Sequence, residues 1–115
     1  MIYKLERSAQ AKRDLASVQR FLVRSYMHFG DDFARAKERS IRRLQGIRLA
    51  MNAIATRPKQ GTLLPKLMPG LRSVTKDRAV FYFLIDEERC VVRVLAVFFG
   101  GQDHQRDMLK RLLSE

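Results

Sequence analysis

Apolar residues recur at three- and four-residue spacing along two long stretches in the first half of the chain. The first seam is Ala11, Leu15, Val18, Leu22, Tyr26 and Phe29. The second seam is Phe33, Lys37, Ser40/Ile41, Leu44, Ile47, Met51 and Ile54. This spacing predicts two amphipathic helices. Ser8 is a candidate N-cap for the first helix and Asp31 or Asp32 for the second, while Gly30 is a candidate C-cap between them. We therefore expect an antiparallel helical hairpin.

The second half of the chain alternates short apolar runs with charged turns, as strands do. A strand is predicted at Ile2–Leu5, before the hairpin. Three more are predicted at Leu71–Lys76, Arg78–Ile85 and Cys90–Phe99, and Asp103 is expected to cap a last helix at Gln105–Leu113. The order β-α-α-β-β-β-α segregates helices from strands and indicates the α+β class, with the hairpin packed on a small, mainly antiparallel sheet. A length of 115 residues predicts one domain, 1–115.

Three further features of the sequence add detail to this predicted fold. The last two strands are apolar on both faces, which predicts that both faces are covered or that one meets a partner. Gly46 lies inside the second helix, where we expect it to allow a close approach of the two helices. The face opposite the second seam is expected to be solvent-exposed and basic: Arg35, Arg39, Arg42 and Arg43.

The charge is strongly positive and unevenly distributed. The net charge is +11, and residues 1–60 carry 14 Lys/Arg against 5 Asp/Glu, whereas residues 61–115 carry 9 against 7. Such a field attracts nucleic acid, a ribosome, anionic lipid or an acidic protein, although a merely solvated basic surface is the alternative. The absence of a signal sequence or membrane span and the single cysteine predict a cytoplasmic protein.

Candidate chemistry is confined to a basic set near the predicted strands. Metal binding is not expected, because His28, His104 and Cys90 are far apart and lack ligand spacing. The basic candidates for binding a nucleic acid or another target are Lys66, Arg72, Lys76, Arg78, Arg93 and Arg106. His104 follows the last strand and, as a histidine, is a candidate acid or base for RNA cleavage. The alternative is a solvated basic rim with His104 hydrogen-bonded locally.

Two stretches resemble a known family. The segment GLRSVTKDRAVFYFLIDEERCVVRVLAVFFGGQDHQRDMLKRLL resembles the C-terminal half of RelE/ParE-type toxins of bacterial type II toxin–antitoxin systems, most nearly the ParE-like members. The opening ERSAQAKRDLASVQRFLVRSYMHFG resembles their first helix, with an A-x-x-D-L pattern at Ala11–Leu15. The predicted order of elements is also that of this superfamily.

The resemblance implies one of two activities. RelE-like members are ribosome-dependent mRNA interferases, and Arg78 and His104 match two of their catalytic positions, but the usual tyrosine is absent and Glu38 is too early in its helix to supply a base. ParE-like members lack that set and inhibit DNA gyrase. Both types are neutralised by a cognate antitoxin whose acidic, amphipathic segment wraps the toxin. No cofactor is expected for this chain. We therefore favour a ParE-like toxin, with an mRNA interferase and a non-toxic nucleic-acid-binding module as alternatives.

Overall fold

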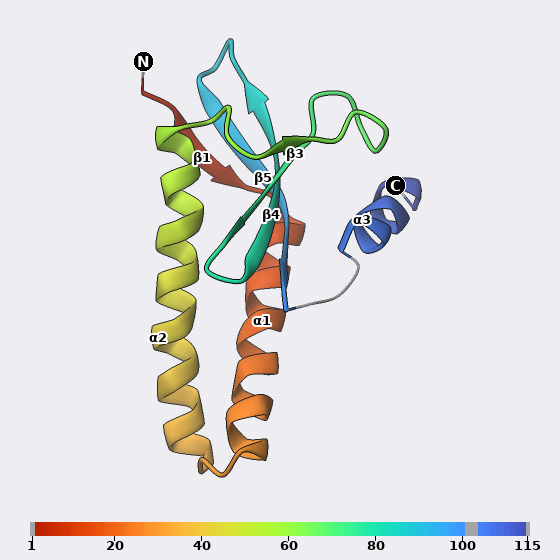
Figure 1. Ribbon diagram of the computed structural model, residues 1–115. Coiled ribbons are helices and arrows are strands. Elements are labelled where there is room, and N and C mark those ends of the chain that lie inside the picture. The colour runs from red at the N-terminus through yellow and green to blue at the C-terminus, as the bar shows by residue number, and fades with distance from the viewer. Residues whose placement is uncertain (1, 101–103, 115) are drawn as a thin grey trace.

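A five-stranded sheet carries a helical hairpin on one face and a single helix on the other (Figure 1). The structure is a computed structural model that describes residues 2–100 and 104–114. Its elements are β1 (Lys4–Arg7), α1 (Ala9–His28), α2 (Phe33–Asn52), the 3-10 helix η1 (Ala53–Thr56), β2 (Thr62–Leu63), β3 (Arg72–Lys76), β4 (Ala79–Asp86), β5 (Val91–Phe99) and α3 (His104–Leu113). The expected α+β class and its helical hairpin are confirmed.

The strands lie in the order β1-β5-β4-β3-β2, and all neighbours are antiparallel except β1 and β5. The first strand was expected at Ile2–Leu5 but lies two residues later, because pairing with β5 in the register Lys4↔Val91 to Arg7↔Val94 fixes it. The predicted order also missed β2. This two-residue strand lies within the proline-containing loop and pairs with the start of β3.

The helical hairpin begins and turns at capped positions. Ser8 Oγ accepts the backbone N–H of Ala11 at 3.0 Å, as expected of an N-cap. Gly30 adopts a φ of 112° just after α1, and its N–H donates to Met27 O while the next N–H donates to Tyr26 O. This pair of bonds is a Schellman motif. Asp32, one of two candidates, caps α2 by accepting the N–H of Arg35 at 2.8 Å.

The second helical seam is confirmed from Ser40 onward, except at Ile41. Leu44, Ile47 and Met51 are buried against the sheet. The expectation was wrong for Phe33, Lys37 and Ile41, which are exposed, and for Phe29 at the end of the first seam. The reason is geometric: the hairpin continues beyond the sheet (Figure 1), so in its projecting part only the other helix can bury a side chain. Small residues, Ala36 and Ser40, take the buried positions there.

The expected role of Gly46 was also wrong. A Cβ at this position would lie 3.3 Å from Asp77 Oδ2, so the glycine makes room for the turn between β3 and β4 rather than for α1. Arg43 was expected on an exposed basic face, but its guanidinium donates to Asp77 Oδ1 at 2.7 Å and lies 5.5 Å from the ring centre of Phe99. One arginine thus ties α2 to the end of the sheet.

Both faces of the sheet are covered, as the two-sided apolar pattern of the strands predicted. On the hairpin side, Phe81, Phe83 and Val94 are fully buried against α1 and α2. Burial of a phenylalanine contributes roughly 1.5–3 kcal/mol, so this face holds much of the core. The second face is covered by α3 and by the loop before β3, through Met108 and Leu71.

The start of α3 differs slightly from expectation. The last helix was expected to begin at Gln105 and to be capped by Asp103; it begins at His104, and residue 103 lies outside the described residues. None of the helices in the described parts of the chain is both long and apolar enough to cross a membrane.

Candidate functional site

The turn between β3 and β4 meets Gly100, the first residue after β5, at one end of the sheet, which we call the Gly100 end. Asp77 and Arg78 form a two-residue turn with φ values of 53° and 65°. Two positive φ values between paired strands define a type I′ turn. The N–H of Gly100 lies 3.4 Å from Arg78 O. Arg78 was expected to open the second core strand, but it lies in this turn, with its side chain exposed.

His104 lies beside the same end of the sheet. Its Nε2 is 2.8 Å from Gly100 O, so Nε2 must carry the proton of this hydrogen bond. Its ring stacks on Phe98 with centroids 5.1 Å apart and planes 22° apart. The residue is 9% exposed, and Nδ1 is buried without a hydrogen-bond partner in the described parts of the chain. Gly100 therefore connects Arg78 to His104 through its backbone, but only the arginine side chain faces solvent.

The other basic candidates do not converge on this place. Lys76 ends β3 and so lies near the Gly100 end. Arg72 and Arg93 lie toward the opposite end, roughly 15–20 Å away at about 3.3 Å per residue of strand. Arg72 donates to Lys59 O at 3.1 Å, and Arg93 pairs with Glu6. Two further candidates lie on separate elements, the loop after β2 and α3: Lys66 and Arg106.

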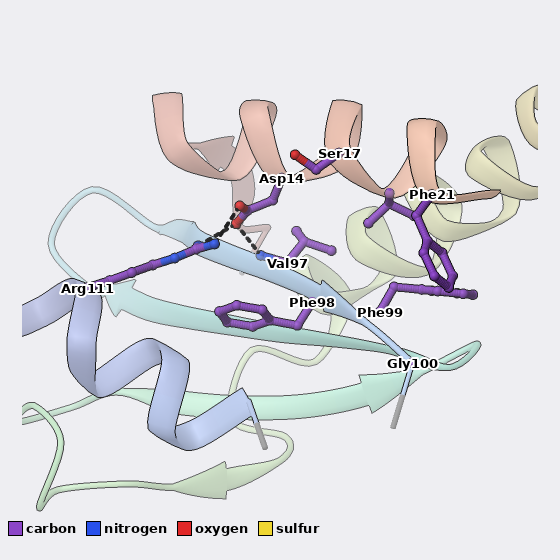
Figure 2. A pocket seen from close by; sticks show the side chains of 9 residues that line it. Asp14, Ser17, Phe21, Val97, Phe98, Phe99, Gly100 and Arg111 are labelled. Atoms are coloured by element: carbon purple, nitrogen blue, oxygen red, sulfur yellow. Dashed lines mark hydrogen bonds and ion pairs between the residues drawn. The ribbon is translucent and has the colours of Figure 1, made fainter. Parts of the chain in front are cut away.

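A hollow of about 300 Å³ lies between α1, β5 and α3 (Figure 2). Its walls are mainly apolar, and they include Phe21 from α1 together with Phe98 and Phe99 from β5. Phe21 and Phe99 lie with ring centroids 6.2 Å apart. The lining also includes an ion pair between α1 and α3, which is drawn with dashed lines in Figure 2.

That ion pair joins Asp14 to Arg111. The guanidinium donates to both carboxylate oxygens, at 2.8 and 2.9 Å, and lies 4.5 Å above the ring of Phe98. Asp14 also accepts the N–H of Val97 at 2.9 Å and a bond from Gln10 at 3.0 Å. A buried carboxylate needs such partners, because removing a charge from water is costly. With its oxygens engaged in this way, Asp14 holds the structure together and is poorly placed to act as a general base.

Sequence reasoning assigned no role to this pair. The signal was present, because Asp14 stands between Ala11, Leu15 and Val18 on the buried side of α1. A carboxylate at a core position requires a cation or several N–H donors. The partner, however, lies 97 residues away in the sequence and is one of 23 Lys/Arg residues, so only the structure identifies it.

The sheet face beneath α3 is apolar where it is described. Val80 and Tyr82 from β4 and Ala96 and Phe98 from β5 line it, and Met108 of α3 packs on them. Tyr82 and Phe98 meet edge to face at 5.7 Å. Bringing a phosphate to this face would require both displacement of α3 and desolvation of the anion on apolar side chains.

The chain shares its architecture with several solved toxin–antitoxin structures. It matches a chain of the chromosomal ParDE TA system from P. aeruginosa with a TM-score of 0.65 and 17% identity, covering 87% of this chain and 98% of that one. The toxin–antitoxin complex RelBE2 from Mycobacterium tuberculosis matches at 0.57 and 16%, covering 89% and 95%. The isolated E. coli RelE toxin matches at 0.51 and 13%, covering 96% and 98%.

No protein-family profile matches the sequence, and no curated protein matches it either. The likeness therefore lies in the three-dimensional arrangement: a helical hairpin, a five-stranded, mostly antiparallel sheet and a C-terminal helix. This chain has the fold of the RelE/ParE toxin superfamily.

Proposed function

We propose that this chain is the toxin of a bacterial type II toxin–antitoxin system and that it acts as ParE-like toxins do, by inhibiting DNA gyrase. The proposal treats residues 1–115 as one toxin domain that acts in the cytoplasm. The observation that carries the choice of target is the apolar sheet face beneath α3, lined by Val80, Tyr82 and Phe98. An interferase must surround a scissile phosphate with cations and supply an acid or base. The scattered positions of Arg72 and Arg93 also favour inhibition by binding.

A cognate antitoxin is part of this proposal. The fold relatives include a ParDE system and a complex named as a toxin–antitoxin pair, RelBE2. A net charge of +11 suits an acidic antitoxin segment, because opposite charges speed association and favour the correct partner. The apolar hollow between α1, β5 and α3 offers room for one or two apolar side chains of such a segment.

Induced expression in a bacterium tests the toxin–antitoxin assignment. We expect growth arrest and an SOS response when the chain is expressed alone, and normal growth when the neighbouring reading frame is expressed with it. Purified protein should inhibit supercoiling by gyrase and leave mRNA on translating ribosomes uncut. Harmless expression without the neighbouring gene product would refute the toxin assignment.

An mRNA interferase is the second candidate, because one observation favours it. Arg78 and His104, the two positions that match interferase residues, are joined through the backbone of Gly100 at one end of the sheet. Cleavage of ribosome-bound mRNA that is lost in Arg78→Ala and His104→Ala would overturn the gyrase proposal. Met108→Ala is the matched control for His104→Ala, since it loosens the same helix without removing an acid or base.

A further inference from the structure

Half of the helical hairpin projects beyond the sheet. Phe21 packs on Phe99, and Arg43 pairs with Asp77, at the level where the sheet ends. Past this level the two helices continue alone (Figure 1). At 1.5 Å per residue, the hairpin reaches roughly 15 Å further. The longest dimension of the molecule, 47 Å, is consistent with this projection.

The end of this projection, Met27 to Phe33, is a fixed structure and not a loose loop; we call it the hairpin tip. The Schellman motif at Gly30 and the N-cap at Asp32 close its two helices. Asp31 accepts a bond from Arg39 at 2.6 Å, and the same guanidinium lies 4.1 Å from the ring centre of Tyr26. Surfaces that are already ordered lose little conformational entropy on binding.

The hairpin tip exposes large apolar side chains. Phe29 is 84% exposed, Phe33 58% and Met27 43%. All three lie within seven consecutive residues around one turn, so they form one patch at the end of the molecule. Isolated exposed apolar residues are ordinary, but a rigid patch of two phenylalanines and a methionine on a projection is typical of a binding surface. None of the three belongs to the core clusters of the described residues.

Cations surround this patch. Arg24 and Lys37 are exposed near it, and the side chain of Arg35 is 72% exposed despite an ion pair with Asp31 at 3.5 Å. Between residues 22 and 42 the hairpin carries five Lys/Arg and three Asp/Glu, and one acid, Asp31, is mostly buried under Arg39. The surroundings of the patch are therefore positive. A partner that accepts the phenylalanines must present an apolar pocket with an acidic rim.

We propose that the hairpin tip is the target-binding surface of the toxin and that it inserts Phe29 and Phe33 into an apolar, carboxylate-rimmed pocket on a protein target. This inference rests on the proposed function. A second copy of the chain fits less well, because both copies carry the same positive charge. A nucleic acid fits less well, because its phosphate backbone offers no apolar pocket for the exposed rings of Phe29 and Phe33. An anionic phospholipid surface is distinguished by the vesicle measurement below.

The test compares three purified chains: wild type, Phe29→Ser/Phe33→Ser, and Leu49→Ser. Leu49 is the matched control, since it is 70% exposed on α2 but lies far from the hairpin tip. All three should unfold at similar temperatures, because the changed side chains are exposed. Growth arrest on induction and inhibition of gyrase supercoiling are measured for each, together with binding to the antitoxin.

We expect the double variant to lose growth arrest and to require at least about tenfold more protein to halve supercoiling, while Leu49→Ser behaves as wild type. Equal arrest by all three chains would overturn the role of the hairpin tip and leave the proposed function standing. A wild type that arrests no growth would instead overturn the proposed function, and the inference with it.

Further measurements identify the occupant. Loss of antitoxin binding in the double variant alone would assign the hairpin tip to the antitoxin and refute the inference. The inference would also be refuted if the wild type sedimented with phosphatidylglycerol vesicles and Phe29→Ser/Phe33→Ser did not. A dimer in light scattering that is present in the wild type and absent in the same double variant would refute it as well. Crosslinking to gyrase from p-benzoylphenylalanine at position 29, and not from the same group at position 49, would support it directly.

Discussion

Asp14 and Arg111 are separated by 97 residues and form a two-bond ion pair that joins the first and last helices of the molecule. The pair also reaches the sheet, because Asp14 accepts the N–H of Val97 in β5. The parallel strand β1 ends at Arg7, opposite Val94, so within residues 2–100 and 104–114 the outer edge of β5 beyond that point has no strand partner. Asp14 therefore takes the place of a strand at this position and fastens α3 at the same time.

Replacement of Asp14 should separate these two roles. We expect Asp14→Ala to lower the free energy of unfolding by about 2 kcal/mol, because it leaves a buried N–H without an acceptor and Arg111 without a partner. Asp14→Asn should cost about 1 kcal/mol, since the amide oxygen can still accept from Val97. Urea unfolding measures both values. Equal losses in the two variants would show that the ion pair, and not the hydrogen bond to β5, provides the stability.

The limited space for a side chain at Gly46 leads to a second prediction. Alanine is favoured over glycine in a helix by about 1 kcal/mol, but a Cβ here lies 3.3 Å from Asp77 Oδ2. Since Arg43 holds that carboxylate at 2.7 Å, we expect Gly46→Ala to be nearly neutral in the wild-type chain. In an Asp77→Ala background the same change should stabilise the protein by about 1 kcal/mol. A double-mutant cycle by urea unfolding checks the coupling.

The sequence predicted the elements of this fold well, because its apolar spacing is strong. Leu44, Ile47 and Met51 recur as a buried helix face requires, and Phe81 and Phe83 alternate as a covered strand requires. The failures came where burial depends on a distant element. Phe33 lies on the same helical seam as Leu44, yet it is exposed, because the sheet does not extend that far.

The candidate site was harder to predict for a related reason. Arg72 and Arg93 are both arginines on strands of the same sheet, but the pairing register of the strands places them away from Arg78. His104 was assigned a possible catalytic role from its position after the last strand. Its stacking on Phe98 and its bond to Gly100 depend on how α3 folds back, which the local sequence does not specify.

The attachment of α3 leads to a third prediction. Met108 is the most buried apolar residue of α3, whereas Leu113 is 76% exposed on the same helix. Met108→Ala should remove packing worth roughly 2 kcal/mol or more, and α3 should open more often instead of leaving a cavity. Hydrogen exchange in residues 104–113 should accelerate about tenfold or more, with β4 little changed. Leu113→Ala, the matched control, should leave exchange as in wild type; faster exchange across the whole sheet in Met108→Ala would mean that α3 does not open independently.

Arg78 carries the last prediction, because its backbone and its side chain have different effects. A non-glycine residue at a φ of 65° is strained by about 1 kcal/mol, and a type I′ turn prefers glycine at this position. The exposed side chain gives the fold little in return. We expect Arg78→Gly to raise the free energy of unfolding by about 1 kcal/mol and Arg78→Ala to leave it unchanged. If Arg78 contacts the target, both variants should arrest growth less than wild type. A Gly variant that is more stable and fully toxic would show that the arginine serves neither the fold nor the target.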